Sequence, residues 1–391
     1  MADRITIHSV EDARRLARRR LPGMIFNFFD GGAGSESSLQ LNQTVLQALR
    51  LQPRVLVNVE QRSLAREFLG HIYSVPFGVA PMGMAGLSWA GADQHLARAA
   101  AINNIPVGVS TASSMSLEQY QERAAGNAWF QLYFSSSIAE TLSLAKRAAA
   151  AGYSNLVFTV DTPILSHRPR ELGAGFKVPF KLGFQQFTDC ALHPHWSLSM
   201  LAHGVPHMAN FSTTSKKQES DSGFNRNVMR GGLDFAFLDK LRAVWPGKLI
   251  VKGVTAVPDA RRIQDSGADA IWISTHGGRQ LDSAPAAITT LTPIREAVGP
   301  AYPLVFDSGV RSGDGIVKAL AMGADFVMLG RPFLYALAAG GKSGLAQLIN
   351  LLTDDISRAL AQIGLTDVND LDQSVVVKDQ IFRDCSNTAG E

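Results

Sequence analysis

The sequence predicts an α/β protein built as a (β/α)₈ (TIM) barrel, on three observations. Eight short apolar runs follow one another from about residue 75, alanine-rich helical stretches separate most of them, and polar side chains gather where the runs end. Runs that are apolar on both faces are typical of parallel strands covered by helices. Eight such units over roughly 250 residues match the usual size of this barrel.

The eight expected strands lie at 75–80, 105–110, 128–133, 156–161, 248–253, 269–274, 303–307 and 325–329. The alternative is a doubly wound open sheet, but no G-x-G-x-x-G motif follows any of these runs. We expect one domain over 1–391, with the barrel at about 75–340 and C-terminal helices and a tail over 341–391.

The segment before the barrel, "SVEDARRLARRRLPGMIFNFFDGGAG" (9–34), predicts an N-terminal helical cap of one or two helices. Ser9 is suited to cap the first helix, and Glu11 and Asp12 fall in its first turn.

The fourth and fifth strands are too far apart for a single helix, so we expect a long insertion, or lid, over 166–231. Its 177–212 part combines aromatic residues with lysines and histidines, a composition typical of membrane interfaces. The residues concerned are Lys177, Phe180, Lys181, Phe184, Phe187, Trp196 and Phe211. A lid or a subunit contact explains the same composition equally well.

Charge and cysteine content exclude several classes of protein. The net charge is +3, and basic residues form no stripe with interleaved aromatics, so we expect no nucleic-acid partner. Cys190 and Cys385 lie far apart without metal-ligand spacing, which favours free thiols in a reducing compartment and no metal site. The N-terminus lacks the apolar core of a secretory signal. We therefore expect a cytoplasmic protein.

The uncharged stretch 75–92 has nearly the length of a membrane span, but Pro76, Pro81 and several glycines interrupt it. A buried strand followed by a loop explains it better.

In a (β/α)₈ barrel, the working residues lie at the carboxyl ends of the strands. The eight ends here carry Ala80 and Pro81, Ser110, Gln131 and Tyr133, Thr159 and Asp161, Lys252, Ser274 and His276, Asp307, and Gly330 and Arg331. The barrel model therefore brings these side chains together on one rim.

The last two strands run into the glycine-rich segments "DSGVRSGDG" (307–315) and "GRP" (330–332). Backbone N–H groups freed by glycines, together with Arg311 and Arg331, favour a phosphate site in the loops where this fold usually has one. Glycines that serve only tight turns are the alternative.

The stretch "ISTHGGRQLD" (273–282) places His276 at the mouth of the barrel. A neutral imidazole suits proton abstraction near pH 7. Gly277 and Gly278 are expected to leave room for a flat ligand, and Arg279 is able to hold a carboxylate through two hydrogen bonds. Asp161 is expected to stabilise the imidazolium that forms.

Six motifs, "HGGRQLD" (276–282), "QLY" (131–133), "TVDTP" (159–163), "VKG" (251–253), "DSGVRSG" (307–313) and "LGRP" (329–332), resemble the FMN-dependent L-2-hydroxy acid dehydrogenases and oxidases. The resemblance runs from about residue 6 to about 370. Segments 193–211 and 109–116 resemble the membrane-associated bacterial (S)-mandelate and L-lactate dehydrogenases within this family.

The resemblance implies FMN as cofactor and a role for each site residue. His276 is the base, Asp161 its partner, and Arg279, Tyr133 and a second arginine, Arg168, hold the substrate carboxylate. Lys252 lies by the N1–C2=O edge of the flavin, where positive charge favours the reduced ring. The implied contacts to the flavin ring and ribityl chain are Ala80, Pro81, Met82, Ser110, Gln131, Thr159 and Ser274, and those to the ribityl chain and phosphate are Asp307, Gly309, Arg311, Gly330 and Arg331.

The chain departs from the family pattern at two places. Phe28 occupies the position of a tyrosine that donates to the substrate carboxylate, so the substrate site lacks one hydroxyl. In "SHRPRELGAG" (166–175), ungapped counting from Asp161 selects Arg168 as the second arginine, although Arg170 precedes the glutamate as the family arginine does. We prefer Arg168.

The leading hypothesis is oxidation of a mandelate- or lactate-like (S)-2-hydroxy acid, with electrons passed to a quinone or another acceptor. An oxidase that uses oxygen, a member with an altered substrate such as a hydroxy acid derivative, a flavin-binding barrel with little turnover, and a non-flavin barrel such as an aldolase are the alternatives. We expect a homotetramer, and the 177–212 segment makes peripheral attachment to the cytoplasmic face of the membrane a further expectation.

Overall fold

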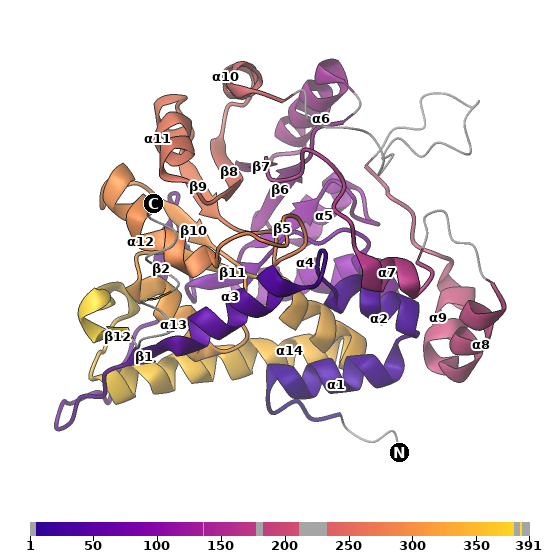
Figure 1. Ribbon diagram of the computed structural model, residues 1–391, viewed down its shortest axis with the longest axis horizontal. Helices are drawn as coiled ribbons and strands as arrows, with labels where there is room; N and C mark the ends of the chain where they lie inside the picture. Colours follow the sequence, from indigo (N-terminus) through magenta and orange to yellow (C-terminus); the bar gives the residue numbers. More distant parts are fainter. Residues whose placement is uncertain (1–4, 136, 177–182, 211–232, 379–383, 385–391) are drawn as a thin grey trace.

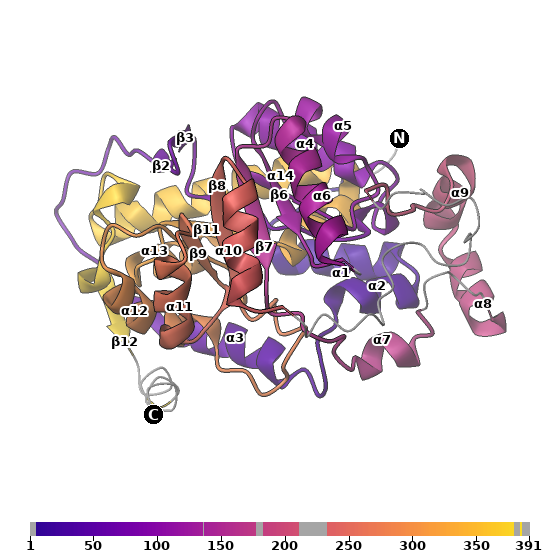
Figure 2. The ribbon, with the colours of Figure 1, turned by 90° about the horizontal axis from the view of Figure 1, so that it is seen from above.

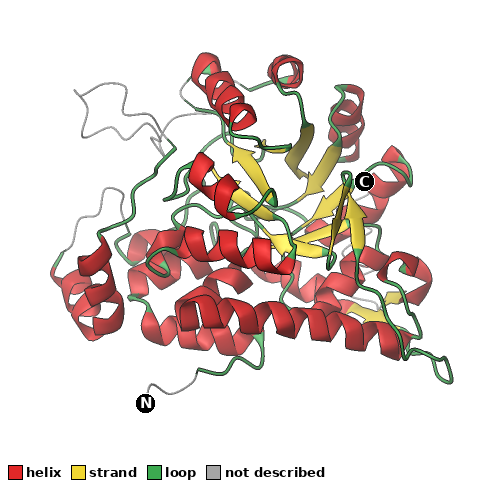
Figure 3. Ribbon diagram, turned by 180° about the vertical axis from the view of Figure 1, so that it is seen from behind, coloured by secondary structure: helices red, strands yellow, loops and turns green. Residues whose placement is uncertain are grey.

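The structure is a computed structural model that describes residues 5–135, 137–176, 183–210, 233–378 and 384 (Figure 1). Its centre is a closed barrel of parallel strands in the order β10-β11-β4-β5-β6-β7-β8-β9, which confirms the predicted fold (Figure 3). The strands are β4 Phe77–Val79, β5 Val107–Ser110, β6 Ala128–Leu132, β7 Asn155–Thr159, β8 Lys248–Val254, β9 Ala270–Ile273, β10 Leu304–Phe306 and β11 Phe326–Leu329. Each end lies within about two residues of its prediction, because short buried runs bounded by turns define strands well.

Helices follow the strands and cover the outside of the barrel (Figure 3). They are α4 Ala92–Asn103, α5 Leu117–Arg123, α6 Ile138–Ala150, α10 Phe235–Val244, α11 Val257–Asp265, α12 Ala287–Val298, α13 Gly313–Ala321 and α14 Arg331–Ile363, with the short η1 Ala85–Leu87 before α4. α14 kinks at Gly340 and Gly341, which have non-helical backbone angles. A side chain on Gly341 would meet the Trp89 ring at 2.6 Å, so the kink requires glycine there.

The N-terminal segment forms α1 Val10–Arg20, α2 Gly23–Asp30 and α3 Ser37–Ala48. Ser9 caps α1 by accepting a hydrogen bond from the Asp12 N–H, as the sequence predicts. α1 packs along α14 (Figure 1), and the turn after α2 reaches the carboxyl rim of the barrel, where the Ala33 N–H donates to the Gly278 carbonyl.

The C-terminal region, expected to hold helices and a tail over 341–391, begins at the kink in α14. The helix continues from the kink to Ile363, and η2 Val368–Asp370, η3 Gln373–Val375 and strand β12 Val376–Lys378 follow. β12 pairs with β1 Leu49–Leu51, so the end of the described chain returns to its N-terminal part.

Apolar side chains fill the inside of the barrel. Trp129, Val157, Ile250, Trp272, Val305, Phe326 and Met328 form one buried cluster. The hairpin of β2 Arg66–Phe68 and β3 His71–Tyr73 closes the amino end, since Phe68 stacks on Trp129 and Tyr73 meets Phe326 edge to face at the starts of their strands. The barrel is therefore packed at its amino end, which leaves the carboxyl end for a ligand.

The insertion after β7 carries α7 Pro169–Gly173, α8 Phe184–Leu192 and α9 Pro194–His203. Figure 2 shows α8 and α9 standing at the edge of the molecule, beside α7 and away from the barrel. Trp196 and Met200 of α9 pack into the hydrophobic core. Trp196 also donates to the Leu87 carbonyl at 2.7 Å, and the Gly23 N–H donates to Asp189 of α8 at 2.6 Å. Lys177, Phe180, Lys181, Phe211 and Cys385 of the sequence analysis lie outside the described residues.

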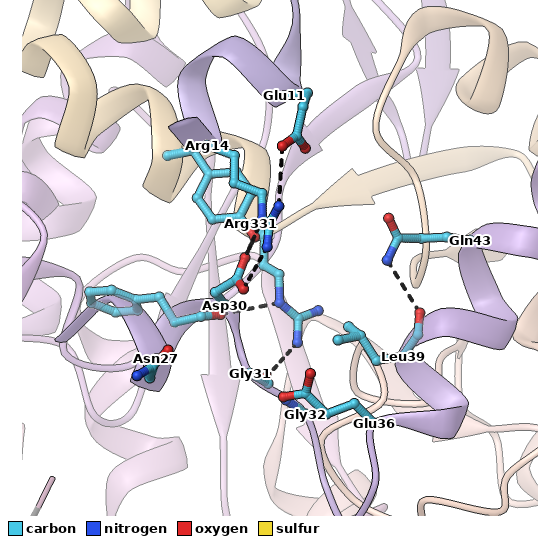
Figure 4. A network of polar contacts seen from close by, with 12 residues as sticks. Glu11, Arg14, Asn27, Asp30, Gly31, Gly32, Glu36, Leu39, Gln43 and Arg331 are labelled. Carbon is cyan, nitrogen blue, oxygen red and sulfur yellow. Dashed lines mark hydrogen bonds and ion pairs between the residues drawn. The ribbon is translucent and has the colours of Figure 1, made fainter. Parts of the chain in front are cut away.

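A buried ion network joins the N-terminal helices to α7 and α14. Asp30 is 4% exposed and accepts hydrogen bonds from Arg14, Arg170 and the Tyr335 hydroxyl (Figure 4 shows the Arg14 side). Burial alone would raise the pKa of Asp30, but these three donors bring it well below its ordinary value. A carboxyl with a lowered pKa stabilises the fold above the pKa of the unfolded chain and loses this contribution as the pH falls.

We expect Asp30→Asn to lower the free energy of unfolding by about 3–5 kcal/mol at pH 7, because it removes the buried carboxylate that pairs with the partly exposed Arg14 and Arg170. The difference from wild type should shrink as the pH falls below about 5. Urea unfolding at several pH values measures this. Asp12→Asn, at an exposed carboxylate paired with Arg15, is the control and should stay near wild type. If the loss of unfolding free energy in Asp30→Asn is the same at every pH, the lowered pKa of Asp30 is contradicted.

Candidate active site

A layer of polar side chains lies on top of the apolar barrel core. Side chains of a strand alternate in direction, so residues two positions after the buried core residues also point inward. Trp129, Val157, Ile250, Trp272 and Val305 are followed in this way by Gln131, Thr159, Lys252, Ser274 and Asp307. These five are all buried, in agreement with the predicted polar rim.

Hydrogen bonds connect this polar layer. Lys252 donates to Ser274 at 2.9 Å and lies 3.4 Å from Asp307, while the Ser274 hydroxyl donates to Asp307 at 2.5 Å. Burial disfavours a charged amine, but the carboxylates of Asp307 and Asp161 raise the pKa of Lys252 above its ordinary value. Lys252 therefore keeps a fixed positive charge at the floor of the site.

Gln131 donates to the Thr159 hydroxyl at 3.0 Å, but its own amide oxygen Oε1 is buried and accepts no hydrogen bond from the described residues. A buried acceptor in this state is costly unless a ligand supplies the donor.

His276 lies above the polar layer, just beyond the end of β9. Its Nδ1 is 2.9 Å from Oδ1 of Asp161, its backbone N–H donates to Ser274, and its Nε2 is 3.4 Å from the Tyr133 hydroxyl. The backbone of His276 has a φ of 55°, a left-handed conformation that is rare outside glycine and often found at functional sites.

Electrostatics keep this pair as a neutral imidazole beside a carboxylate. Burial lowers the pKa of His276 below its ordinary value, although Asp161 acts in the opposite direction. Burial alone would raise the pKa of Asp161, but His276 and Lys252 bring it below its ordinary value. A neutral imidazole with Nδ1 held by a carboxylate has Nε2 ready to accept a proton.

An open cleft extends from His276 across the barrel mouth to the loops after β10 and β11. Most of the predicted site residues line it, namely Phe28, Ala80, Pro81, Met82, Ser110, Tyr133, Thr159, Arg168, Lys252, His276, Arg279, Asp307, Gly309, Arg311, Gly330 and Arg331. Asp161, Gln131 and Ser274 lie behind this surface, each hydrogen-bonded to a residue that lines it: His276, Thr159 and Lys252 respectively.

The two candidate arginines of the insertion point in different directions. Arg168 lines the cleft, and its Nε and Nη2 donate to the Arg279 carbonyl at 3.3 and 3.1 Å. Arg170 turns away and bonds to Asp30 and Glu36. The geometry therefore favours Arg168 as the second arginine of the site.

Phe28 lines the cleft next to Arg279. Its ring stacks on Phe176 with centroids 4.2 Å apart, and the Arg279 guanidinium carbon lies 5.5 Å from the centroid of Phe28. Arg279 also donates to the backbone carbonyls of Phe28 and Gly31. A ring thus stands beside the arginine at the position where the family pattern has a hydroxyl.

The paired glycines after His276 act differently from the expectation. A side chain on Gly278 would meet the backbone of Leu39 at 2.5 Å, so Gly278 lets α3 approach and does not line the cleft. Gly277 does line it, but a side chain there would meet Arg331 at 2.8 Å. The prediction that both glycines make room for a flat ligand was wrong for Gly278, because only tertiary packing shows which neighbour uses the space.

The far end of the cleft is rich in positive charge. Arg311 is partly buried, and the loss of solvent around it lowers its pKa to about 10. Its Nη1 donates to the Val310 carbonyl, and no carboxylate among the described residues lies within ion-pair distance of it. Arg331 is buried and donates to the carbonyls of Phe29, Gly277 and Gly31, the last of these bonds being visible in Figure 4. Two guanidinium groups withdrawn from solvent without an acidic partner fit an anionic ligand such as a phosphate.

Sequence reasoning missed the apolar wall of the cleft and two polar residues near the arginines. The wall consists of Met84, Ile164, Leu165, Phe176 and Met208, and the polar residues are Glu171 and Gln280. Gln280 follows Arg279 directly in the motif "HGGRQLD", so the motif itself could have predicted that Gln280 lies at the site. The wall residues come from separate loops, and their spacing carries no signal.

Fold and site together define a (β/α)₈-barrel enzyme with a histidine–aspartate pair and two pairs of arginines, Arg168 with Arg279 and Arg311 with Arg331, around one cleft. The model of the FMN-dependent dehydrogenase family matches residues 17–378. The chain belongs to this family.

Curated relatives agree with the family. The (S)-mandelate dehydrogenase of Pseudomonas putida is 41% identical over 367 residues, 93% of this chain and 92% of the relative. An L-lactate dehydrogenase of Xanthobacter autotrophicus is 36% identical over 95% of this chain and 97% of its own length. The crystal structure of the monotopic membrane protein (S)-mandelate dehydrogenase superposes with a TM-score of 0.91 at 38% identity, covering 96% of this chain and all of that one.

The cofactor of this family, FMN, fits the cleft. Bound FMN would have a ring N–H for the unpaired Gln131 oxygen, a flat ring for the polar layer, and a phosphate for the guanidinium groups of Arg311 and Arg331. These groups are otherwise costly to bury, so the residues present match the cofactor in chemistry and in order along the cleft.

Proposed function

We propose that the protein oxidises an (S)-2-hydroxy acid of the mandelate or lactate type to the 2-oxo acid. When bound, FMN accepts the two electrons that leave the substrate. The observation that carries the proposal is the His276–Asp161 pair, which stands in one cleft with Arg168, Arg279 and the polar layer. The names of the relatives support the substrate class.

In this proposal each side chain has one task. Nε2 of His276 takes the proton that leaves the substrate hydroxyl or α-carbon, and Asp161 stabilises the imidazolium. Arg168, Arg279 and Tyr133 hold the carboxylate and thereby orient the reacting carbon.

The remaining site residues hold the cofactor. Lys252 would supply its positive charge at the N1–C2=O edge of the ring. Contacts to the ring and ribityl chain come from Ala80, Pro81, Met82, Ser110, Gln131, Thr159 and Ser274, and contacts to the ribityl chain and phosphate from Asp307, Gly309, Arg311, Gly330 and Arg331.

Anaerobic mixing of the FMN-loaded protein with (S)-mandelate or L-lactate tests the proposal, because substrate oxidation bleaches the flavin absorbance. Bleaching by the S but not the R enantiomer is the expected result. A flavin that stays oxidised with every aliphatic and aromatic 2-hydroxy acid would support a binding barrel with little turnover instead.

We also propose a quinone as the electron acceptor, at a membrane surface. Among the described residues, the helices are too short or too polar to cross a bilayer. The exposed faces of α8 and α9, however, carry Phe184, Phe187, Leu192, Leu198 and Leu201, and the first and last of these are 84% and 82% exposed. An apolar helical face of this kind inserts into the lipid headgroup region. Rapid turnover with oxygen and formation of peroxide would favour an oxidase.

The double variant Phe184→Ser/Leu201→Ser is expected to lose binding to anionic vesicles at least tenfold, since burial of each large apolar side chain is worth about 1.5–3 kcal/mol. Vesicle co-sedimentation measures the change. Ile102→Ser, on α4 and 74% exposed, is the matched control and should bind as wild type. Equal binding of all three proteins would show that α8 and α9 are a lid or a subunit contact.

For the assembly we propose a homotetramer. The loop that holds Val55, Leu56 and Val57 is exposed, with Leu56 in a left-handed conformation, and such an apolar loop suits a contact between subunits. Light scattering should give four times the 42.1 kDa chain mass, and a mass of one chain would refute the tetramer.

A further inference from the structure

Glu171 is a buried carboxylate at the carboxylate-binding end of the cleft. Its side chain is 7% exposed, and its Oε2 lies 3.5 Å from Nη1 of Arg168 and 3.7 Å from Nη2 of Arg279. One oxygen of Glu171 therefore faces both arginines to which the substrate carboxylate is assigned.

Backbone contacts hold the two arginines close to this oxygen. Arg168 donates to the carbonyl of Arg279 through Nε and Nη2, and Ser166 donates to the same carbonyl at 2.5 Å. Nη1 of Arg279 is held by the carbonyls of Phe28 and Gly31. With these donors fixed, Nη2 of Arg279 and Nη1 of Arg168 are the arms that point to Glu171.

Arg168, Arg279 and Glu171 form a group of three charges that meet at one oxygen of Glu171. Lys252 is paired with Asp307, and Asp161 with the neutral imidazole of His276. Within the group of three, the two arginines supply two positive charges and Glu171 removes one. This group therefore keeps one net positive charge, which matches a ligand with a single carboxylate.

We propose that Glu171 is a positioning residue that sets the charge of this subsite, so that the arginine pair selects monocarboxylates over dicarboxylates. This inference rests on the proposed function of Arg168 and Arg279. It assigns Glu171 a role in substrate choice, distinct from a contribution to the stability of α7.

The test compares three ligands that share a phenyl ring, lack the oxidisable hydroxyl and differ in charge: phenylacetamide, phenylacetate and phenylmalonate. Each is titrated into FMN-loaded protein, and binding is followed by the change in flavin absorbance. Glu171→Gln keeps the shape of the side chain and removes its charge.

We expect Glu171→Gln to bind phenylmalonate on the order of tenfold more tightly than wild type does, the effect of one unit charge a few ångströms away in a partly buried site. Phenylacetate should gain less, and the neutral amide should change less than about twofold. Glu171→Asp, which keeps the charge, should restore the wild-type order of affinities. Equal shifts for all three ligands, or no gain for phenylmalonate, would overturn the proposal.

Two further comparisons serve as a control and as a replacement for a variant that does not fold. Glu36→Gln removes a carboxylate that pairs with Arg170 outside the cleft and should leave the three affinities in their wild-type ratio. If Glu171→Gln does not fold, Arg168→Met is compared with Arg168→Met/Glu171→Gln: the added change should strengthen anion binding about tenfold, and no gain would overturn the proposal. Because binding is measured without turnover, this inference and the proposed function can fail independently.

Discussion

Replacing His276 by alanine is expected to slow reduction of the flavin by a 2-hydroxy acid by on the order of 10²–10⁴-fold, while FMN stays bound. His276 is the group in the cleft whose Nε2 faces the substrate region and whose Nδ1 is held by a carboxylate. Stopped-flow absorbance measures reduction, and the flavin-to-protein ratio measures cofactor binding. His203→Ala, at an exposed histidine of α9, is the matched control. A loss of less than about tenfold would refute the role of His276.

The pH dependence of the wild type provides a second test of the same group. Because burial lowers the pKa of His276, the neutral imidazole persists below its ordinary pKa of about 6.5. The rate of reduction should therefore hold through neutral pH and fall only as the pH drops through this lowered pKa, when the base becomes protonated. The acid limb should be absent from the residual activity of His276→Ala. An acid limb above pH 7 in the wild type would contradict the assignment.

Phe28→Tyr is expected to raise kcat/KM for ordinary 2-hydroxy acids roughly 10–150-fold. The new hydroxyl enters the cleft beside Arg279, where it adds one hydrogen bond to a charged carboxylate, worth about 1.5–3 kcal/mol. Steady-state kinetics with lactate, mandelate and a mandelate ester measure the effect. Phe187→Tyr, on the exposed face of α8, is the control.

The mandelate ester distinguishes two explanations for a phenylalanine at position 28. If the natural substrate is bulkier or lacks a free carboxylate at this position, the hydroxyl becomes a buried polar group without a partner, and activity with the natural substrate falls. The close stacking of Phe28 on Phe176 leaves a larger ring little room to shift. Unchanged kinetics with every substrate would mean that residue 28 does not contact the substrate.

The sequence by itself determined the barrel and the composition of its mouth. Strands buried on both faces must be apolar along their length, so β4 to β11 are visible as eight runs. The two-residue period of a strand then places five polar side chains above the core, independently of how the outer helices pack. They are Gln131, Thr159, Lys252, Ser274 and Asp307.

Only the tertiary structure decided which side chains from distant loops share the cleft. Arg168 and Arg170 are two residues apart and chemically alike, yet one lines the cleft and the other neutralises Asp30. The sequence suggests that Gly278 leaves space for a ligand, but α3 occupies that space. Met208 and Phe176 reach the site through loop paths that no local periodicity encodes. Local sequence patterns indicate secondary structure and burial. Which loops lie side by side depends on long-range packing, and that packing is determined by the whole sequence and not by any one segment of it.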